Sequence, residues 1–362
     1  MAKKILCIID YLGSGGAQRQ IVNLAVEFKK SGHDISFLTY HNKNDFYRLT
    51  LEDNNIPIAC IAESNYIKRM IKMRKYIRHG KYDVILSFLA AANFICEIST
   101  FPYHKWKLIV GERSANPHLL ISWKLRLFRY FHIFANQVVA NSQTNIELVR
   151  QVNSFLSKKK CKVIYNMIDL AKWMPSDSFT FRKNELFTIV VLASHRHLKN
   201  LNGFIDAVLL LTKEEQSELR IQWYGNILDN SFDLGIIKIK ENGIEDIFQF
   251  ENATHNILDC MQQADAVGLF SFYEGFPNAI CEGMACGKPV LCSNISDIPL
   301  LITEKKLIFD PNDVFSISKT LRFLLSLNAD ELNEIGKKNR TMAEQYFDKE
   351  AIVSKYITLF NA

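Results

Sequence analysis

Short apolar runs alternate along the chain with longer segments whose apolar residues recur every three or four positions. The runs are typical of buried strands, and the longer segments are typical of amphipathic helices. A helix is predicted between the first two runs, from about 16 to 30. In the N-terminal half, strands are predicted at 4–10, 34–40, 84–88, 107–112 and 137–142. Strands that alternate with helices indicate right-handed βαβ units and therefore a parallel sheet.

The same alternation occurs a second time further along the chain. It stops at 164–169, where a polar stretch begins that runs to Glu185, and then it resumes. Strands are predicted at 187–194, 220–225, 247–251, 266–271 and 288–293, and helical patterns fill about 314–360. We therefore expect two consecutive doubly wound α/β sheets. Ligands bind such sheets at the carboxyl ends of the strands, so functional residues are expected there.

The composition agrees with two soluble domains. The chain has 362 residues, of which 48% are hydrophobic and 23% charged, and its mean hydropathy is −0.03. The longest uncharged apolar stretch, around 89–96, is far shorter than the roughly 20 residues that cross a bilayer. The first apolar run ends at Asp10 without a cleavage pattern, which favours a strand over a signal peptide. The scattered cysteines are typical of reduced thiols in a cytoplasmic protein.

Charge divides the chain into two different halves. Residues 1–168 contain 25 lysines and arginines and 11 acidic residues, whereas residues 169–362 contain 19 and 27. The N-terminal half is therefore strongly basic. This asymmetry indicates that it meets an anionic partner, either nucleic acid or an acidic membrane surface.

A glycine-rich loop follows the first predicted strand. Gly13, Gly15 and Gly16 open the first helix without the G-x-G-x-x-G spacing of a dinucleotide-binding fold, which disfavours an NAD enzyme. Glycines at a helix N-terminus allow a phosphate or a sugar hydroxyl to approach the backbone N–H groups. Tight turns between strand and helix also use glycine, so the loop alone leaves both interpretations open.

A pair of glutamates follows the strand predicted at 266–271. Gly275 and Pro277 keep a helix from starting before about Asn278, so Glu274 is expected on a strand-end loop and Glu282 about one turn into the helix. Two carboxylates beside a helix N-terminus provide acceptors for sugar and ribose hydroxyls and amide donors for a diphosphate. An Asp-x-Asp motif or histidine cluster would be expected at a metal site. Neither is present, so no metal requirement is predicted.

The segment 274–290 resembles the E-x7-E signature and the A-x-G-x-P-V turn of the retaining glycosyltransferases of family 4, which have the GT-B fold. The resemblance covers essentially the whole chain. Further motifs similar to those of the family are, in order, Gly15-Gly-Ala-Gln-Arg19, Ser87-Phe-Leu89 with Ala92-Asn93, Ile164-Tyr-Asn-Met-Ile-Asp169 and Ala264-Asp265.

The resemblance implies an α/β protein with two Rossmann-like domains that face a cleft. Residues 1–166 would form an acceptor-binding domain, and residues 167–345 would bind the nucleotide sugar. The last helix, about 346–362, would cross back to the N-terminal domain. Closure of the cleft would accompany donor binding.

The resemblance also assigns roles in the donor site. Glu282 would accept the ribose hydroxyls of a nucleotide sugar, and Glu274 would bind hydroxyls of the transferred sugar. Gly15 and Gly16 would join this site. The backbone that serves the sugar and the distal phosphate would be that of Gly275, Phe276, Pro277 and Asn278.

Two cations complete the donor site implied by the resemblance. Lys199 matches the lysine that neutralises the leaving diphosphate, and Arg196 precedes it by three residues instead of the usual five. Arg196 either reaches the phosphates from a shifted position or caps the loop. Preorganised cations lower the barrier where negative charge grows. The resemblance favours front-face attack without a protein nucleophile, and it implies neither a cofactor nor a metal.

Candidates on the acceptor side are less well defined. Many relatives place a histidine at an N-terminal strand end, and no matching histidine is present at Ser87 or near Gly111. Arg19, Glu112 and Arg113 are the acceptor-side candidates, although Glu112 and Arg113 fit a structural ion pair equally well. His195 and His197 are expected to be solvated loop residues beside the donor site.

Two segments, 66–81 and 121–134, concentrate the basic charge and mix it with apolar and aromatic residues. Helices of this composition lie at the surface of anionic membranes. The alternative is that their apolar residues pack on the sheet and the cations are solvated. No motif for nucleic-acid binding is recognisable.

The family resemblance, taken together with these patterns, implies a cytoplasmic enzyme that is peripheral at the inner face of the membrane. It would transfer a sugar from a nucleotide sugar, with uridine inferred from family frequency, to a lipid-linked or glycan acceptor. The product would belong to O-antigen, capsule or lipopolysaccharide synthesis. Two alternatives remain, a soluble transferase of the sucrose or glycogen type and a silent GT-B subunit that binds a sugar nucleotide.

Overall fold

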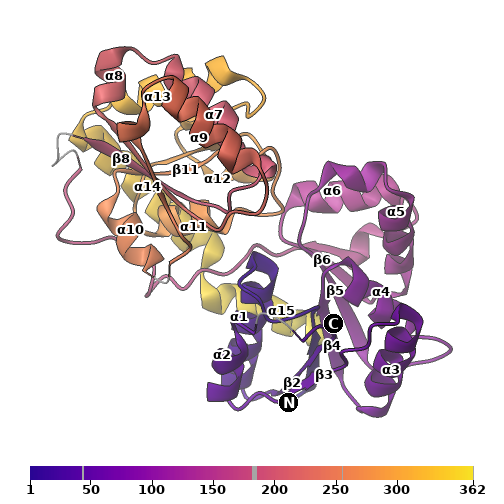
Figure 1. The fold of residues 1–362 in the computed structure, drawn as a ribbon. Coiled ribbons are helices and arrows are strands. Elements are labelled where there is room, and N and C mark those ends of the chain that lie inside the picture. The colour runs from indigo at the N-terminus through magenta and orange to yellow at the C-terminus, as the bar shows by residue number, and fades with distance from the viewer. Residues whose placement is uncertain (43–44, 182–185, 255, 362) are drawn as a thin grey trace. The chain divides into compact units, whose positions relative to one another are not determined.

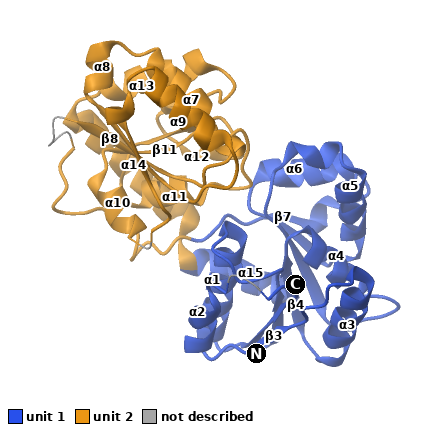
Figure 2. Ribbon diagram, viewed as in Figure 1, with its two compact units in different colours: residues 1–167, 350–362 blue, residues 168–349 orange. Residues whose placement is uncertain are grey.

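A computed structural model of the protein describes residues 1–42, 45–181, 186–254 and 256–361. The chain forms two compact units (Figure 2). Unit 1 contains residues 1–167 and 350–362, and unit 2 contains residues 168–349. The end of the predicted polar stretch at Glu185 and the last residue of the predicted final helix, 362, lie outside the described residues.

Unit 1 contains a seven-stranded parallel sheet with the strand order β3-β2-β1-β4-β5-β6-β7 (Figure 1). Its strands are β1 (Lys4–Ile8), β2 (Asp34–Thr39), β3 (Ile58–Cys60), β4 (Val84–Phe88), β5 (Lys107–Glu112), β6 (Gln137–Ala140) and β7 (Cys161–Val163). Its α-helices are α1 (Gly16–Lys30), α2 (Arg48–Asp53), α3 (Tyr66–His79), α4 (Ala90–Ile98), α5 (Trp123–Tyr130), α6 (Gln143–Val152) and α15 (Lys349–Asn361). Short 3₁₀ helices are η1 (Pro117–Leu120), η2 (Phe131–Phe134) and η3 (Lys158–Lys160).

Helices cover both faces of this sheet, which explains the nearly continuous apolar runs of its strands. Ile5 and Cys7 of β1 belong to a core with α1 and α15, whereas Leu6 and Ile8 belong to a core with α3, α4 and α6. Successive side chains of a strand point to opposite faces, so a strand that is covered on both sides buries nearly all of its side chains and is apolar throughout.

Unit 2 contains a six-stranded parallel sheet with the order β10-β9-β8-β11-β12-β13. Its strands are β8 (Phe187–Leu192), β9 (Leu219–Tyr224), β10 (Phe248–Glu251), β11 (Ala266–Leu269), β12 (Val290–Ser293) and β13 (Ile308–Phe309). Its α-helices are α7 (Leu201–Leu209), α8 (Lys213–Ser217), α9 (Ser231–Glu241), α10 (Ile257–Gln263), α11 (Asn278–Ala285), α12 (Ile298–Leu301), α13 (Val314–Ser326) and α14 (Ala329–Phe347). Short 3₁₀ helices are η4 (His197–Lys199), η5 (Glu245–Ile247) and η6 (Lys305–Leu307).

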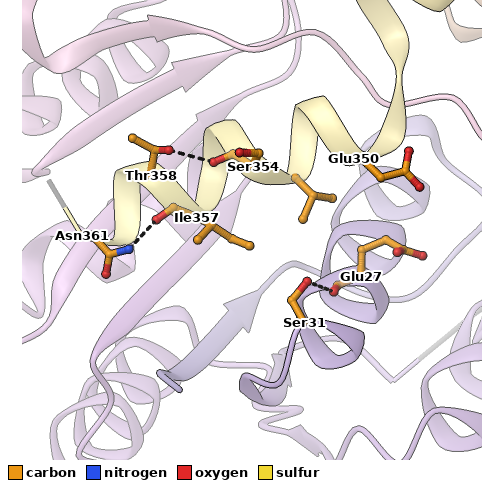
Figure 3. Close-up of a pocket in the computed structure, with 8 residues that line it drawn as sticks. Glu27, Ser31, Glu350, Ser354, Ile357, Thr358 and Asn361 are labelled. Atoms are coloured by element: carbon orange, nitrogen blue, oxygen red, sulfur yellow. Dashed lines mark hydrogen bonds between the residues drawn. The ribbon is translucent and has the colours of Figure 1, made fainter. Parts of the chain in front are cut away.

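The last helix returns to unit 1 and completes its core. Tyr356 and Phe360 of α15 pack edge-on against Phe28 of α1, with ring centroids 6.1 and 5.0 Å apart. Asp348, whose extended backbone ends α14, separates that helix from the returning helix, which begins at Lys349 where the prediction gave about 346. Figure 3 shows α15 beside α1. A pocket of about 310 Å³ lies between the two helices.

The strands that the pattern did not predict are β3, β7 and β13, each of two or three residues. All three lie at a sheet edge. A run this short shows neither alternation nor a continuous apolar stretch, so periodicity alone does not distinguish it from a loop.

Candidate functional site

The carboxyl ends of β8 and β11 carry the strongest predicted residues. These strands are direct neighbours in the sheet of unit 2, so the loops that follow them lie side by side. Lys199 ends the loop after β8, and Asn200 follows in the left-handed conformation, with φ of 57°. The Asn200 amide donates to the Pro311 carbonyl at 2.8 Å, which fixes the backbone just beyond Lys199.

Lys199 and Glu274 form an ion pair between these two loops. The ammonium of Lys199 donates to Oε1 of Glu274, and the two side chains are 13% and 18% exposed. The hydroxyl of Ser271 donates to the same oxygen at 2.9 Å. Ser271 is fully buried, so the carboxylate of Glu274 is bound by one buried hydroxyl and by the partly exposed ammonium of Lys199.

The sequence predicted Lys199 and Glu274 as members of one site, and the structure brings them into contact. Ser271 was missed. Its only signal was its place three residues before Glu274, where it looks like the last residue of the predicted strand. A buried hydroxyl at this place requires a partner, and Glu274 is the partner that the structure provides.

Helix α11 begins at Asn278, as the glycine and proline before it predicted. The carbonyl of Gly275 accepts a hydrogen bond from the Ser296 hydroxyl at 2.8 Å, and Phe276 packs against Phe347 with ring centroids 5.7 Å apart. These contacts fix the loop between Glu274 and the helix. The N-terminus of α11 therefore has a defined place beside Glu274.

Glu282 lies on α11 and is only 4% exposed. The next residue, Gly283, faces β11 so closely that a Cβ atom there would lie 2.8 Å from Cγ2 of Val267. Glycine at this position thus lets the helix approach the strand. The close approach sets the depth at which the Glu282 carboxylate lies.

Arg196 and the two neighbouring histidines have different environments. The side chain of Arg196 is exposed, and its carbonyl accepts from the Lys199 N–H at 2.8 Å. His197 is exposed, and its backbone N–H donates to Asp229 at 2.8 Å.

The prediction of a solvated His195 is wrong. This ring is 2% exposed and packs among Trp223, Phe232 and Phe250, with centroids 5.6, 4.6 and 5.5 Å away. Burial among these rings lowers the pKa of His195 to about 4. His195 is therefore a neutral part of the aromatic core under the loop.

The glycine loop lies at the carboxyl end of β1 in unit 1, where the sheet order places β2 on one side and β4 on the other. Gly15 caps α1 and Gly16 begins it, and both are exposed. A Cβ atom on Gly15 would lie 2.3 Å from Oε1 of Gln18. Arg19 follows in the first turn, where its N–H donates to the Gly15 carbonyl at 2.9 Å and its side chain is half-buried.

Glu112 belongs to a buried ionic cluster and does not face solvent. The carboxylate is 2% exposed and bonds to Arg129 at 2.7 Å and to Nε2 of His132 at 3.0 Å. Nδ1 of His132 lies 2.5 Å from Glu97. Of the two interpretations open for Glu112, the structural ion pair is therefore the one that the contacts support.

Arg113 holds several parts of unit 1 together. Its guanidinium lies 3.7 Å above the ring of Phe88 and donates to Asn166 at 3.2 Å and to the Tyr356 hydroxyl at 2.5 Å. These partners come from β4, from the segment after β7 and from α15. Arg113 thus connects the end of β5 to β4, to the segment that precedes the passage into unit 2, and to the helix that follows the return from it.

The pocket between α1 and α15 contains none of the predicted site residues. It is lined by Glu27, Ser31, Glu350, Val353, Ser354, Ile357, Thr358 and Asn361 (Figure 3). Among the residues that the structure describes, no three histidine, cysteine or acidic side chains come together as metal ligands would. In the same part of the chain, no helix is long and apolar enough to cross a membrane.

Two family models match the chain, one in each unit. The model described as Glycosyltransferase Family 4 matches residues 14–172, and the model described as Glycosyl transferases group 1 matches residues 176–342. The chain belongs to the family 4 glycosyltransferases. The predicted family is thereby confirmed.

This glycosyltransferase is 26% identical, over 294 residues, to a Campylobacter jejuni protein. The match covers 78% of this chain and 76% of that protein. The relative is named as an α-1,4-N-acetyl-D-galactosaminyltransferase acting on GalNAc-α-(1→4)-GalNAc-α-(1→3)-diNAcBac-PP-undecaprenol.

Solved structures share the fold of this glycosyltransferase. Anabaena HepE, in complex with UDP and glucose, matches with a TM-score of 0.86 and 19% identity over 99% of both chains. Sucrose-phosphate synthase from Thermosynechococcus elongatus matches with a TM-score of 0.81 and 13% identity over 99% of this chain and 98% of that one. At this identity the matches show the fold, and they confirm the predicted GT-B architecture of two Rossmann-like domains.

Proposed function

We propose that this glycosyltransferase moves a hexosyl or N-acetylhexosaminyl group from a UDP-sugar to a lipid-linked saccharide, with retention and without a metal. The observation that carries the proposal is the contact of Lys199 with Glu274 beside the start of α11. It places a cation for a diphosphate next to a carboxylate for sugar hydroxyls. The name of the Campylobacter relative supports a lipid-linked acceptor.

In the proposed donor complex, Glu274 accepts hydrogen bonds from hydroxyls of the transferred sugar, and Glu282 accepts them from the ribose. The backbone of 275–278 lines the sugar and the phosphates. Lys199 leaves Glu274 for the diphosphate when the donor binds, because a diphosphate carries more negative charge than one carboxylate. Ser271 then keeps the carboxylate in place.

The proposed reaction forms a bond between the acceptor oxygen and the anomeric carbon on the face from which the diphosphate leaves. The bond from that carbon to the diphosphate oxygen breaks, and the leaving oxygen takes the proton of the acceptor hydroxyl. Negative charge grows on the diphosphate, where Lys199 and Arg196 neutralise it. These cations would supply the stabilisation that a divalent metal supplies elsewhere, which supports metal independence.

Arg19 and Arg113 are the proposed acceptor-side residues, and the protein is proposed to act at the inner face of the cytoplasmic membrane in surface-glycan synthesis. A sucrose-phosphate synthase shares the fold, so the fold alone is equally compatible with a transferase of the sucrose type. The name of the sequence relative favours the lipid-linked acceptor. The intact contact between Lys199 and Glu274 disfavours a silent subunit.

The deciding experiment measures binding and hydrolysis of a panel of nucleotide sugars in EDTA. We expect one donor to bind the wild type, and we expect Glu282→Ala to lose that binding because the ribose acceptor is gone. Glu245→Ala, an exposed glutamate of the same unit, is the matched control and should bind normally. Binding that appears only after a divalent metal is added would contradict metal independence, and no binding of any nucleotide sugar would contradict the function.

Ser271→Ala tests the positioning role of the buried hydroxyl. We expect affinity for the nucleotide sugar to fall about 10-fold, as befits a lost hydrogen bond to a charged group, with affinity for the nucleoside diphosphate unchanged. Titration calorimetry with both ligands measures this difference. Ser293→Ala is the control, because Ser293 is equally buried at a strand end but donates to the Leu269 carbonyl. A similar loss for both ligands would show a general structural effect and would contradict the positioning role.

A further inference from the structure

The exposed apolar side chains of unit 1 gather on one side of its sheet. Among the described residues, all of the large ones except Met1, Phe46 and Leu49 belong to α3, α5, the 3₁₀ helices beside α5, the short link between η1 and α5, or the loops that follow α4 and α6. Helices α3, α4, α5 and α6 cover the same face of the sheet (Figure 1). This face therefore combines a buried apolar interior with an apolar exterior.

Helix α5 shows most clearly that this exterior is not core. Phe128 points inward and stacks on Phe94, with ring centroids 4.8 Å apart. Trp123, Leu127 and Tyr130 point outward and are 77%, 42% and 40% exposed. Their spacing of four and three residues puts them on one stripe of the helix. Packing on the sheet thus explains only the inner side of α5.

A third element continues this surface, and the sequence patterns did not single it out. The loop at 153–160 carries Phe155, which is 84% exposed. Asn153 donates to the Arg129 carbonyl of α5 at 2.9 Å, and Lys160 donates to the Ile133 carbonyl of η2 at 2.7 Å. The loop is therefore attached both to the end of α5 and to η2.

Buried ion pairs make α5 and η2 a firm support for this surface. Arg129 of α5 and His132 of η2 both bond to Glu112 of β5, and His132 also contacts Glu97 of α4. Helix α4 has no exposed residue and lies between α3 and α5. The exposed stripes of α3 and α5 thus belong to one layer of helices, on either side of the covered helix α4.

The charge of this layer is almost entirely positive. Residues 66–160 contain 17 lysines and arginines and four acidic residues, and two of the four, Glu97 and Glu112, are buried in the ionic cluster. Some of the cations have structural partners. Arg74 and Arg78 donate to carbonyls at the end of α4, including that of Phe101.

Other cations of the layer are exposed around the apolar side chains. They are Lys68 of α3, Lys124 and Arg126 of α5, and Lys158 and Lys159 of the loop at 153–160. Exposed aromatic and aliphatic groups among exposed cations match the interface of a bilayer that contains anionic lipid, because the apolar groups enter the headgroup boundary and the cations meet phosphate. A soluble partner would have to be both acidic and strongly apolar.

We propose that α3, α5 with η2, and the loop at 153–160 form one surface that rests on an anionic bilayer. The inference builds on the proposed lipid-linked acceptor and assigns the docking surface to particular residues. Helix α5 runs from the carboxyl end of β5 toward the amino end of β6. Trp123 therefore contacts the bilayer near the carboxyl ends of the strands, where the acceptor-side candidates lie. Phe155 precedes β7 and contacts the bilayer near the amino ends of the strands.

Sedimentation with vesicles tests this surface. We expect the full-length protein to bind phosphatidylcholine vesicles that contain phosphatidylglycerol, to bind pure phosphatidylcholine weakly, and to dissociate as salt is added. Trp123→Glu and Phe155→Glu should each lower binding about 10-fold, because each removes an aromatic anchor and adds a repelled charge. Phe315→Glu is the matched control, since Phe315 is 73% exposed on α13 of unit 2, and it should bind as the wild type does.

Three results would overturn the proposal. One is normal vesicle binding by both Trp123→Glu and Phe155→Glu, and another is no binding of the wild type to anionic vesicles. The third is self-association of the wild type that these substitutions abolish without affecting vesicle binding, which would make the surface an interface between copies. Nucleotide-sugar binding in solution separates the two proposals, because the docking variants should retain it, and its failure in the wild type would leave the vesicle result standing.

Discussion

Replacing Lys199 with alanine is expected to lower the rate of sugar transfer about 100- to 1,000-fold, the usual effect of removing one preorganised charge-stabilising donor. The Lys199 ammonium lies between the loops after β8 and β11, in contact with Glu274. It is the cation that the diphosphate would meet as negative charge grows on it. The loss should fall mainly on kcat, because the interaction strengthens in the transition state.

Steady-state kinetics with the donor identified in the panel measure this effect. Lys238→Ala is the matched control, because Lys238 forms an ion pair with Asp206 in the same unit, at 2.8 Å, away from the strand ends. We expect the control to retain the wild-type rate. Equal rates for Lys199→Ala and the wild type would contradict the role given to this lysine.

Replacing Glu112 with alanine is expected to destabilise unit 1 by about 3–5 kcal/mol, because the change leaves buried cations without their shared carboxylate. Arg129 and His132 would both lose this partner, and both are buried. Calorimetry should show the transition of unit 1 shifted down by about 10 °C, given the entropy of unfolding of a domain this size. A shift of less than 2 °C would make the cluster energetically unimportant, on the same scale of about 2–4 °C per kcal/mol.

The control for Glu112 is the pair of Glu63 with Lys72, whose lysine side chain is 60% exposed. Glu63→Ala is expected to leave the transition of unit 1 nearly unchanged, since exposed ion pairs contribute little. The two substitutions remove the same charge from the same unit. Their difference therefore isolates the effect of burial.

The cluster also gives stability a pH dependence. Contacts with Glu97 and Glu112 raise the pKa of His132 to about 9, and the positive charges of Arg129 and His132 lower the pKa of Glu112 to about 2. The contribution of His132 is complete below its ordinary pKa of 6.5 and is lost as pH rises through 9. The contribution of Glu112 is complete above 4.5 and is lost as pH falls through 2.

Burial raises the pKa of Glu97, the third titrating member of the cluster, so its contribution is complete below 4.5 and is lost as pH rises. As far as this cluster decides it, the melting temperature of unit 1 should therefore be highest near pH 4.5 and should fall toward pH 9, with the loss from His132 added above pH 6.5. His132→Gln should flatten the decline above pH 6.5, because the titrating group is gone. Melting curves across this range measure the slope. An identical slope in the variant would show that another group causes the decline.

The fold was largely predictable because strands covered on both faces leave an unmistakable apolar run. Helix α1 begins and ends at the predicted residues, 16 and 30. The edge strands β3, β7 and β13 were not predictable, since two or three residues show no period. The start of the last helix was predicted only as about 346, because a single extended residue such as Asp348 does not interrupt a helical pattern.

The candidate site was only partly predictable. Motif spacing identified Lys199 and Glu274, but their contact depends on β8 lying beside β11, which is a property of the sheet order. The role of Glu112 remained open because its partners come from separate segments of the chain. The sequence also did not show which face of α5 is exposed. A helix that is apolar on most sides gives no sign in its sequence of which side is covered.

The return of α15 to unit 1 has a consequence for the order in which the protein is synthesised. Unit 1 begins first and is completed last, because Tyr356 and Phe360 fill its core from the far end of the chain. At about 5–20 residues per second, a ribosome needs on the order of 10–40 s to add residues 168–349. Throughout that time α15 cannot cover the apolar side of α1 around Phe28, so this side is exposed to solvent. A chaperone could bind it until α15 emerges.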